Sequence, residues 1–109
     1  MIRVTVFRSE GRISGFRLTG HADYDEYGKD IICSAMSMLA INTLNSMIVI
    51  ANERFDYDQN EEDGLIEVRF DHEPNEYAGV LLSSFELGVQ GVIDQYGNEF
   101  VSLVYETDE

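Results

Sequence analysis

Hydrophobic and polar residues alternate at the start of the chain, which is the pattern of a half-buried β-strand. Ile2, Val4 and Val6 fall on one side of such a strand, and the polar residues between them fall on the other. Four further short stretches have a strand-like composition, and turn residues such as Gly11 and Gly64 separate neighbouring stretches. We therefore predict five strands, at residues 2–7, 13–18, 54–58, 65–70 and 100–105.

In two longer stretches the apolar residues recur every three to four positions, as they do on the buried face of a helix. The first helix is predicted over residues 32–52, with Asp30 as its N-cap and Cys33 in its first turn. Its predicted buried positions form a broad face: Met36, Ala40, Ile41, Leu44, Met47 and Ile48. Pro74 introduces a second helix, which ends at Gly97. The positions predicted to share its buried face are Tyr77, Leu81, Phe85, Val92 and Tyr96.

The predicted order of elements is β-β-α-β-β-α-β, which indicates an α+β fold with two helices packed on one face of a sheet. A chain of 109 residues suffices for one domain, 1–109, whose core needs neither disulfides nor metals. The single cysteine cannot form a disulfide within the chain, which favours a reducing compartment, and we expect a cytoplasmic protein. Serine and asparagine residues interrupt the apolar-rich stretch 31–51, so we do not expect it to span a membrane.

The charge of the chain narrows the range of possible partners. Acidic residues outnumber basic ones by 21 to 7, and the net charge is −14. Such a chain repels a phosphate backbone, so we do not expect direct nucleic-acid binding through a basic face. An acidic surface attracts basic partners. A second interpretation of the charge is that it simply keeps the protein soluble. The sequence has no Gly-rich phosphate loop and no Cys/His cluster with metal-ligand spacing, so we expect neither a cofactor nor a metal.

The candidate chemistry lies at the two ends of one irregular stretch. Residues 20–29 fit neither a strand nor a helix period and are predicted to form a loop, with His21 near its start and Cys33 just beyond its end. A thiol attacks a carbonyl as the thiolate, which a helix N-terminus or a neighbouring imidazolium favours. Cys33 and His21 are therefore candidates for a nucleophile and its general base. The residues alone leave a second interpretation open, since a free cysteine often behaves as a buried small hydrophobe.

Residues 20–37 read GHADYDEYGKDIICSAMS, and this segment resembles the signature of the ribosomal-processing cysteine protease family, known as Prp. That signature is a G-H-A element followed about a dozen residues later by G-x-D-I-[VI]-C-x-A-x-S. The first element is matched by Gly20, His21 and Ala22. The second element is matched by Gly28, Asp30, Ile31, Ile32, Cys33, Ala35 and Ser37.

The resemblance implies a function and a mechanism. Cys33 and His21 would form a catalytic dyad. By analogy with the third member of a catalytic triad, Asp30 is a candidate to orient the pair, although a plain helix cap explains Asp30 as well. The family forms homodimers of small α+β domains. Its substrate is the 27th large-subunit ribosomal protein, from which the enzyme removes a basic N-terminal extension by cutting after an aromatic residue. The acidic charge of this chain agrees with such a basic substrate.

Four further residues are predicted to bind the substrate. Gly20 and Ala22 belong to the first motif element, and Gly20 would permit a backbone conformation that other residues resist. Tyr27 would contact an aromatic side chain of the substrate, and Ser37, one turn after Cys33, would line the same site.

The sequence is also compatible with two functions other than that of a protease. One is a non-catalytic homodimeric module that binds a basic ribosomal segment without cutting it. The other is a thiol redox protein, against which the lack of a second cysteine counts.

Overall fold

The computed structural model describes residues 1–20 and 29–107, of which residues 29 and 30 are described by their backbone alone. The elements follow one another in the predicted β-β-α-β-β-α-β order. They are β1 (Ile2–Ser9), β2 (Arg12–Thr19), α1 (Lys29–Val49), β3 (Asp56–Asn60), β4 (Leu65–Arg69), α2 (Glu76–Tyr96) and β5 (Val101–Thr107).

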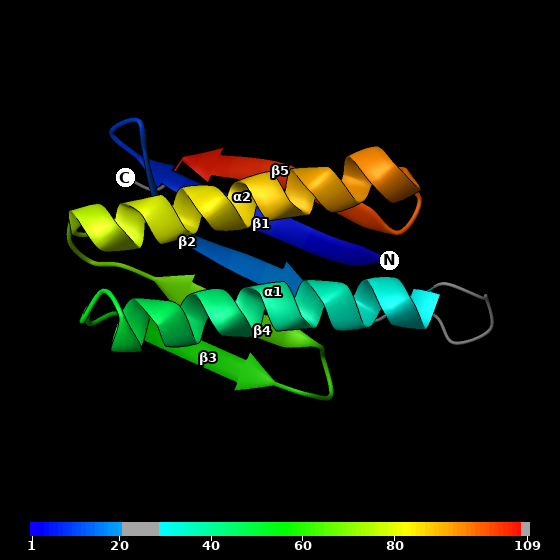
Figure 1. The fold of residues 1–109 in the computed structure, drawn as a ribbon, viewed down its shortest axis with the longest axis horizontal. Helices are drawn as coiled ribbons and strands as arrows, with labels where there is room; N and C mark the ends of the chain where they lie inside the picture. The colour runs from blue at the N-terminus through cyan, green and yellow to red at the C-terminus, as the bar shows by residue number, and fades with distance from the viewer. Residues whose placement is uncertain (21–28, 108–109) are drawn as a thin grey trace.

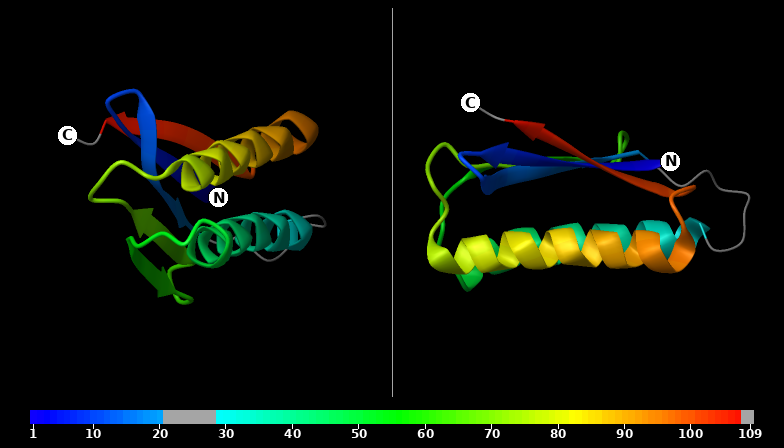
Figure 2. Two further views of the ribbon diagram at one scale, coloured as in Figure 1. Left: turned by 60° about the vertical axis from the view of Figure 1, so that its left-hand side comes forward. Right: turned by 90° about the horizontal axis from the view of Figure 1, so that it is seen from above.

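The five strands form one mixed sheet in the order β3-β4-β2-β1-β5. All neighbours are antiparallel except β1 and β5, which pair in parallel. Both helices lie side by side across one face of this sheet (Figures 1 and 2). The predicted α+β architecture with two helices on one face is therefore confirmed.

The core lies between the sheet and the two helices. Ile2, Val4 and Val6 are at most 1% exposed, as the alternation along β1 predicts. Four of the six positions predicted to be buried on α1 are at most 5% exposed, and Ile41 is partly buried. Ile48 is 40% exposed, so its predicted burial is wrong. The ring of Phe16 on β2 stacks on that of Phe85 on α2, with centroids 4.1 Å apart, and this contact fixes α2 against the middle of the sheet.

The opposite face of the sheet has its own small cluster. Phe7 follows the core residue Val6 and therefore points away from the helices, yet it is only 1% exposed. The guanidinium groups of Arg17 and Arg69 cover its ring, with Arg69 3.5 Å from the ring centroid. Two of the seven basic residues of the chain are thus placed on the far side of the sheet from the helices.

The buried face of α2 differs from the one predicted. Tyr77 and Tyr96 are 67% and 47% exposed, and only Phe85 of the predicted set is fully buried. The residues that α2 buries are Ala78, Leu82, Phe85 and Val89. Steps of four residues, such as 77–81–85, drift around a helix with 3.6 residues per turn, whereas steps of four and three keep to one face. The second helix does end at Gly97, as predicted, with a φ of 87°.

The first helix begins earlier than predicted. Because α1 starts at Lys29, Asp30 lies within the helix, and the prediction of Asp30 as N-cap is wrong. The stretch Ile31–Val49, with a mean hydropathy of 1.5, is also long and apolar enough to cross a membrane by length and composition, despite the serine and asparagine residues within it. Its apolar residues have a different use here, since Ile32, Met36 and Ala40 pack into the hydrophobic core.

Candidate active site

One side of α1 presents three residues to a common hollow. Cys33, Ser37 and Ile41 are spaced four residues apart, so they lie one above another on the helix, and all three are partly exposed. Cys33 is the fifth residue of α1 and lies at the start of the second turn, so its predicted place in the first turn is wrong. Helical side chains lean toward the N-terminus, however, so the thiol leans over the first turn, whose N–H groups have no partner within the helix.

The other walls of this hollow come from the sheet and from the end of the β3–β4 hairpin. The cavity has a volume of about 240 Å³. Besides the three residues of α1, it is lined by Ile2, Leu18, Gly20, Gln59, Asn60, Glu61, Gly64, Leu65 and Ile66. At about 30 Å³ for each water molecule, the space is that of roughly eight waters, which is room for one large side chain.

Gly20 holds the end of β2 at the rim of the cavity. Its φ of 99° is disfavoured for other residues, and an added Cβ would lie 2.3 Å from the backbone oxygen of Met1. Its N–H donates a hydrogen bond of 3.2 Å to the carbonyl oxygen of Asp63. The predicted need for glycine at this position is confirmed. The chain is thereby fixed between the start of β1 and the β3–β4 turn.

The structure thus brings three of the predicted site residues together: Cys33, Ser37 and Gly20. Three others, His21, Ala22 and Tyr27, lie outside the described residues. Asp30 is described only as a helical backbone position, one turn before Cys33.

Sequence reasoning missed the hairpin wall of the site. The acidic turn after β3 had no predicted role in the site, yet Asn60 and Glu61 line the cavity. The side chain of Asn60 shapes this turn, because its Oδ1 accepts hydrogen bonds from the N–H groups of Glu62 (2.9 Å) and Asp63 (3.4 Å). An asparagine before Gly64 predicts the turn itself, but nothing local in the sequence places that turn beside α1.

Two larger hollows lie toward the other end of the molecule, near the β1–β2 turn and the start of α2. Their volumes are about 320 and 510 Å³, and Arg12, Ile13 and Pro74 line both. Neither contains Cys33. Within residues 1–20 and 29–107, no group of three or more His, Cys, Asp or Glu side chains is arranged to hold a metal ion.

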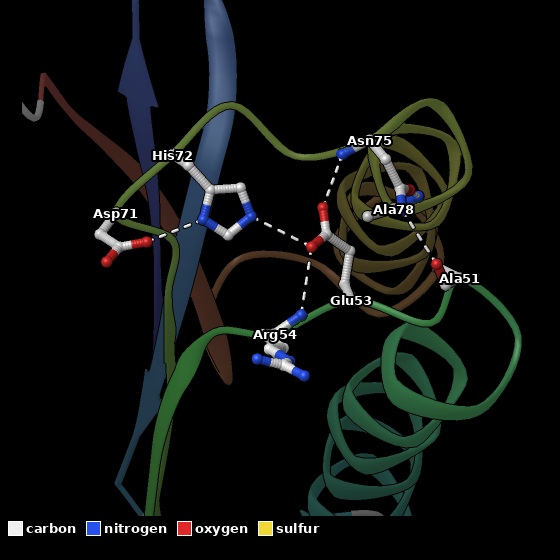
Figure 3. A network of polar contacts seen from close by, with 7 residues as sticks. All are labelled: Ala51, Glu53, Arg54, Asp71, His72, Asn75 and Ala78. Carbon is white, nitrogen blue, oxygen red and sulfur yellow. Dashed lines mark hydrogen bonds and ion pairs between the residues drawn. The ribbon is translucent and has the colours of Figure 1, made fainter.

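The second histidine of the chain belongs to a separate polar network beyond the end of α1 (Figure 3). The ring of His72 lies between two carboxylates, with Nδ1 2.7 Å from Asp71 Oδ1 and Nε2 3.0 Å from Glu53 Oε1. Glu53 also accepts a 2.7 Å hydrogen bond from the N–H of Asn75, the N-cap of α2. This network joins the exit of α1 to the start of α2. His72 is therefore not placed to serve Cys33.

The charges of this network shift one another's pKa values. The hydrogen bonds to Asp71 and Glu53 raise the pKa of His72 above 6.5. Burial alone would raise the pKa of Glu53, but hydrogen bonds from the Asn75 N–H and from His72 outweigh it and lower that pKa below 4.5. The pKa of Asp71 is lowered chiefly by its hydrogen bond to His72. Between about pH 4.5 and 6.5, Glu53 is therefore mostly ionised while His72 is mostly protonated.

We expect the substitution His72→Gln to destabilise the fold more at pH 6 than at pH 8.5. The folded state holds the His72 proton more tightly than the unfolded chain, so this stabilisation is complete below pH 6.5 and is lost as the pH rises through the raised pKa. Because the ring is 43% exposed, solvent screening limits the effect at pH 6 to about 0.5–1 kcal/mol. Urea unfolding of both proteins at the two pH values measures it. An equal loss at both values would show that the charge of His72 is unimportant.

Comparisons with known proteins identify the family of this chain. The model of the family described as cysteine protease Prp matches residues 1–101. The ribosomal processing cysteine protease Prp of Staphylococcus aureus is 30% identical over 105 residues, which are 96% of this chain and 97% of that protein. Its counterpart in Bacillus subtilis is 34% identical over 65 residues, which are 59% of this chain and 58% of that one.

Solved structures show the same fold. SMU.848 from Streptococcus mutans superposes with a TM-score of 0.88 at 31% identity, covering 99% of this chain and 96% of that one. The Prp of S. aureus, in complex with a substrate peptide, gives a TM-score of 0.88 at 29% identity and covers 97% of this chain and 100% of its own. A cavity lined by a partly exposed cysteine, a fold shared with a peptide-bound protease, and a family match over 101 residues lead to one conclusion. This chain belongs to the Prp family of cysteine proteases.

Proposed function

We propose that this cysteine protease removes the N-terminal extension of the 27th large-subunit ribosomal protein, with Cys33 as nucleophile and His21 as general base. The observation that carries the proposal is the position of Cys33, partly exposed in a cavity of about 240 Å³ between α1 and the β3–β4 turn. A buried, inert cysteine would have favoured a non-catalytic module instead.

Two observations support His21 as the base. Gly20, the residue before it, lines the same cavity as Cys33. The chain has only two histidines, and His72 is engaged by Glu53 and Asp71 at the far end of α1. From Cys33 to the end of that helix at Val49 is about 24 Å at 1.5 Å per residue, so His72 is out of reach.

The reaction follows from these roles. His21 takes the proton from the thiol of Cys33, and the thiolate attacks the carbonyl carbon of the scissile bond. The imidazolium of His21 then gives its proton to the leaving amine, and an acyl-enzyme thioester remains. His21 next removes a proton from water, whose attack on the thioester releases the carboxylate and restores the thiol. Asp30, one turn from Cys33, acts as a positioning residue for the pair.

The cavity is suited to the side chain that precedes the cut. Ser37 and Ile41 provide a polar and an apolar contact on the α1 side, and Leu65 and Ile66 add apolar surface opposite. An aromatic residue fits this mixed lining and its volume. Gly20, Ala22 and Tyr27 complete the substrate contacts in this proposal.

The proposal includes a homodimer of single domains, each spanning residues 1–109, in the cytoplasm. Val80 and Leu87 on α2 are 64% and 74% exposed and offer apolar surface for the second copy.

Cleavage of a synthetic peptide that spans the extension tests this function, with wild type compared with His21→Ala and His72→Ala. We expect one cut, after an aromatic residue, identified by mass spectrometry. Loss of the base should lower kcat/KM by roughly 10²–10⁴-fold for His21→Ala, whereas His72→Ala should cleave like wild type at pH 7. The second variant is a matched control, since it removes the other imidazole of the chain.

The alternatives predict different results. Tight peptide binding without cleavage by folded wild type would identify a non-catalytic binding module. Equal losses for the two histidine variants would contradict the assignment of His21.

A further inference from the structure

β3 is an edge strand whose outer side is left unpaired by the described part of the chain. The sheet order ends at β3, and its only strand partner is β4. All five residues from Asp56 to Asn60 are exposed. An edge strand presents alternate backbone N–H and C=O groups that have no partner in the sheet, and these groups can pair with an additional extended chain.

This free edge leads directly into the cavity that contains Cys33. Gln59 and Asn60, the last two residues of β3, line that cavity together with Glu61. At about 3.4 Å per residue, β3 offers roughly 17 Å of edge, which is the length of five residues of an extended peptide. A peptide paired with β3 would therefore run along the edge toward the cavity that Cys33 lines. The other edge strand, β5, contributes no residue to this cavity.

The acidic charge of the β3 edge favours a basic segment over a second copy of β3 as its partner. Residues 56–63 carry five acidic side chains and no basic one. A second copy of β3 paired antiparallel in register would bring Asp58 against Asp58, and like charges opposite each other destabilise a sheet. The edge has no lysine or proline, so the acidic side chains of Asp56 and Asp58 are what protects it against pairing with its own copy. Self-pairing is thus disfavoured, whereas a basic extended segment is attracted.

We propose that the outer edge of β3 binds the substrate as a sixth strand of the sheet, so that a basic extended segment beside the scissile bond pairs with residues 56–60. This inference rests on the proposed function, to which it adds the mode of substrate recognition. Main-chain pairing supplies affinity that depends little on side chains, and the cavity at the end of the strand supplies selectivity for one side chain.

The first test is a scan in which single amide nitrogens of the extension peptide are methylated in turn. A paired peptide directs every second N–H at β3, so methylation should lower kcat/KM by roughly 3- to 10-fold at alternate positions and change it little between them. A scan without this period of two, with cleavage of the parent peptide intact, would overturn the pairing and leave the protease assignment standing. Failure to cleave the parent peptide, and to bind it to Cys33→Ala, would overturn both.

Hydrogen exchange of Cys33→Ala with and without the peptide locates the pairing. We expect slower exchange in residues 56–60 and unchanged exchange in residues 101–107, so the other edge of the same sheet is the internal control. Protection of 101–107, or protection around Cys33 without any at 56–60, would contradict the proposal.

A pair of charge variants tests the electrostatic selection. Asp58→Asn should raise KM for the peptide about 3-fold at low salt with kcat unchanged, and added salt should reduce the difference. Asp94→Asn removes the same charge from an exposed position on α2 and should leave KM unchanged. Equal effects of the two variants would show that only the overall charge matters and would contradict a role for this edge.

Discussion

Cys33→Ala is expected to lower kcat/KM for the extension peptide by roughly 10⁴-fold or more, because it removes the atom that forms the acyl-enzyme. Folding should be little affected. Cys33 is only partly buried, and alanine is the most favourable residue within a helix. Peptide affinity, measured by titration, should stay within a few-fold of the wild-type value. The fall in kcat/KM should therefore come from kcat.

The control for this variant is its neighbour on α1. Ser34→Ala changes an exposed residue that is not part of the cavity, and it should cleave at the wild-type rate. Cys33→Ser tests the chemistry further, since it keeps the size of the side chain but replaces a thiol by a hydroxyl. Unchanged cleavage by Cys33→Ala would mean that another group performs the attack, and the assignment of the nucleophile would be wrong.

Gly20→Ala should both destabilise the protein and impair cleavage. The added Cβ would lie 2.3 Å from the carbonyl oxygen of Met1, and the backbone carries a φ of 99° that alanine resists. Overpacking against a backbone atom together with a strained φ should cost on the order of 3 kcal/mol in the free energy of unfolding. Since Gly20 lies at the rim of the cavity, we also expect kcat/KM to fall at least about 10-fold under conditions where the variant is folded.

Gly11→Ala is the control that separates the effect of a positive φ from the effect of the close contact with Met1. Gly11 has a comparable positive φ of 79°, but nothing lies within 4 Å of an added Cβ. Its substitution should cost only about 1–2 kcal/mol and should leave cleavage unchanged. Chemical denaturation and peptide cleavage of both variants provide the comparison. If Gly20→Ala behaved like Gly11→Ala in both measurements, the close contact with Met1 would have no structural importance.

Local patterns predicted the elements of this fold well. Alternation identified β1 because one side of a strand faces the core, and the repeat of Met36, Ala40 and Leu44 identified the buried side of α1. The same reasoning gave the wrong buried face for α2, because it counted the large tyrosines as buried and overlooked the small buried residue Ala78. Size and hydrophobicity indicate burial, but a small residue gives little signal even where packing depends on it.

The site was predictable only where its residues lie close together in the sequence. Cys33 and Ser37 share one side of α1 by helical spacing, so their proximity follows from periodicity. The turn at Asn60 and Glu61 reaches the same cavity only because β4, which continues the hairpin, pairs with β2. Strand order depends on contacts between distant segments. No local sequence pattern encodes the strand order. The contact between Glu53 and His72, which are 19 residues apart, could not be predicted for the same reason.

The parallel pairing of β1 with β5 has a consequence for how the chain folds. Ile2 lies opposite Val101, so this pairing joins segments about 100 residues apart, and closing such a loop costs about 4 kcal/mol in chain entropy. The local hairpins β1–β2 and β3–β4 need no such closure and should form early, whereas β5 should dock late. Until it docks, the outer edge of β1 is open to pairing with other chains. Refolding at high protein concentration should therefore yield aggregates that originate at β1.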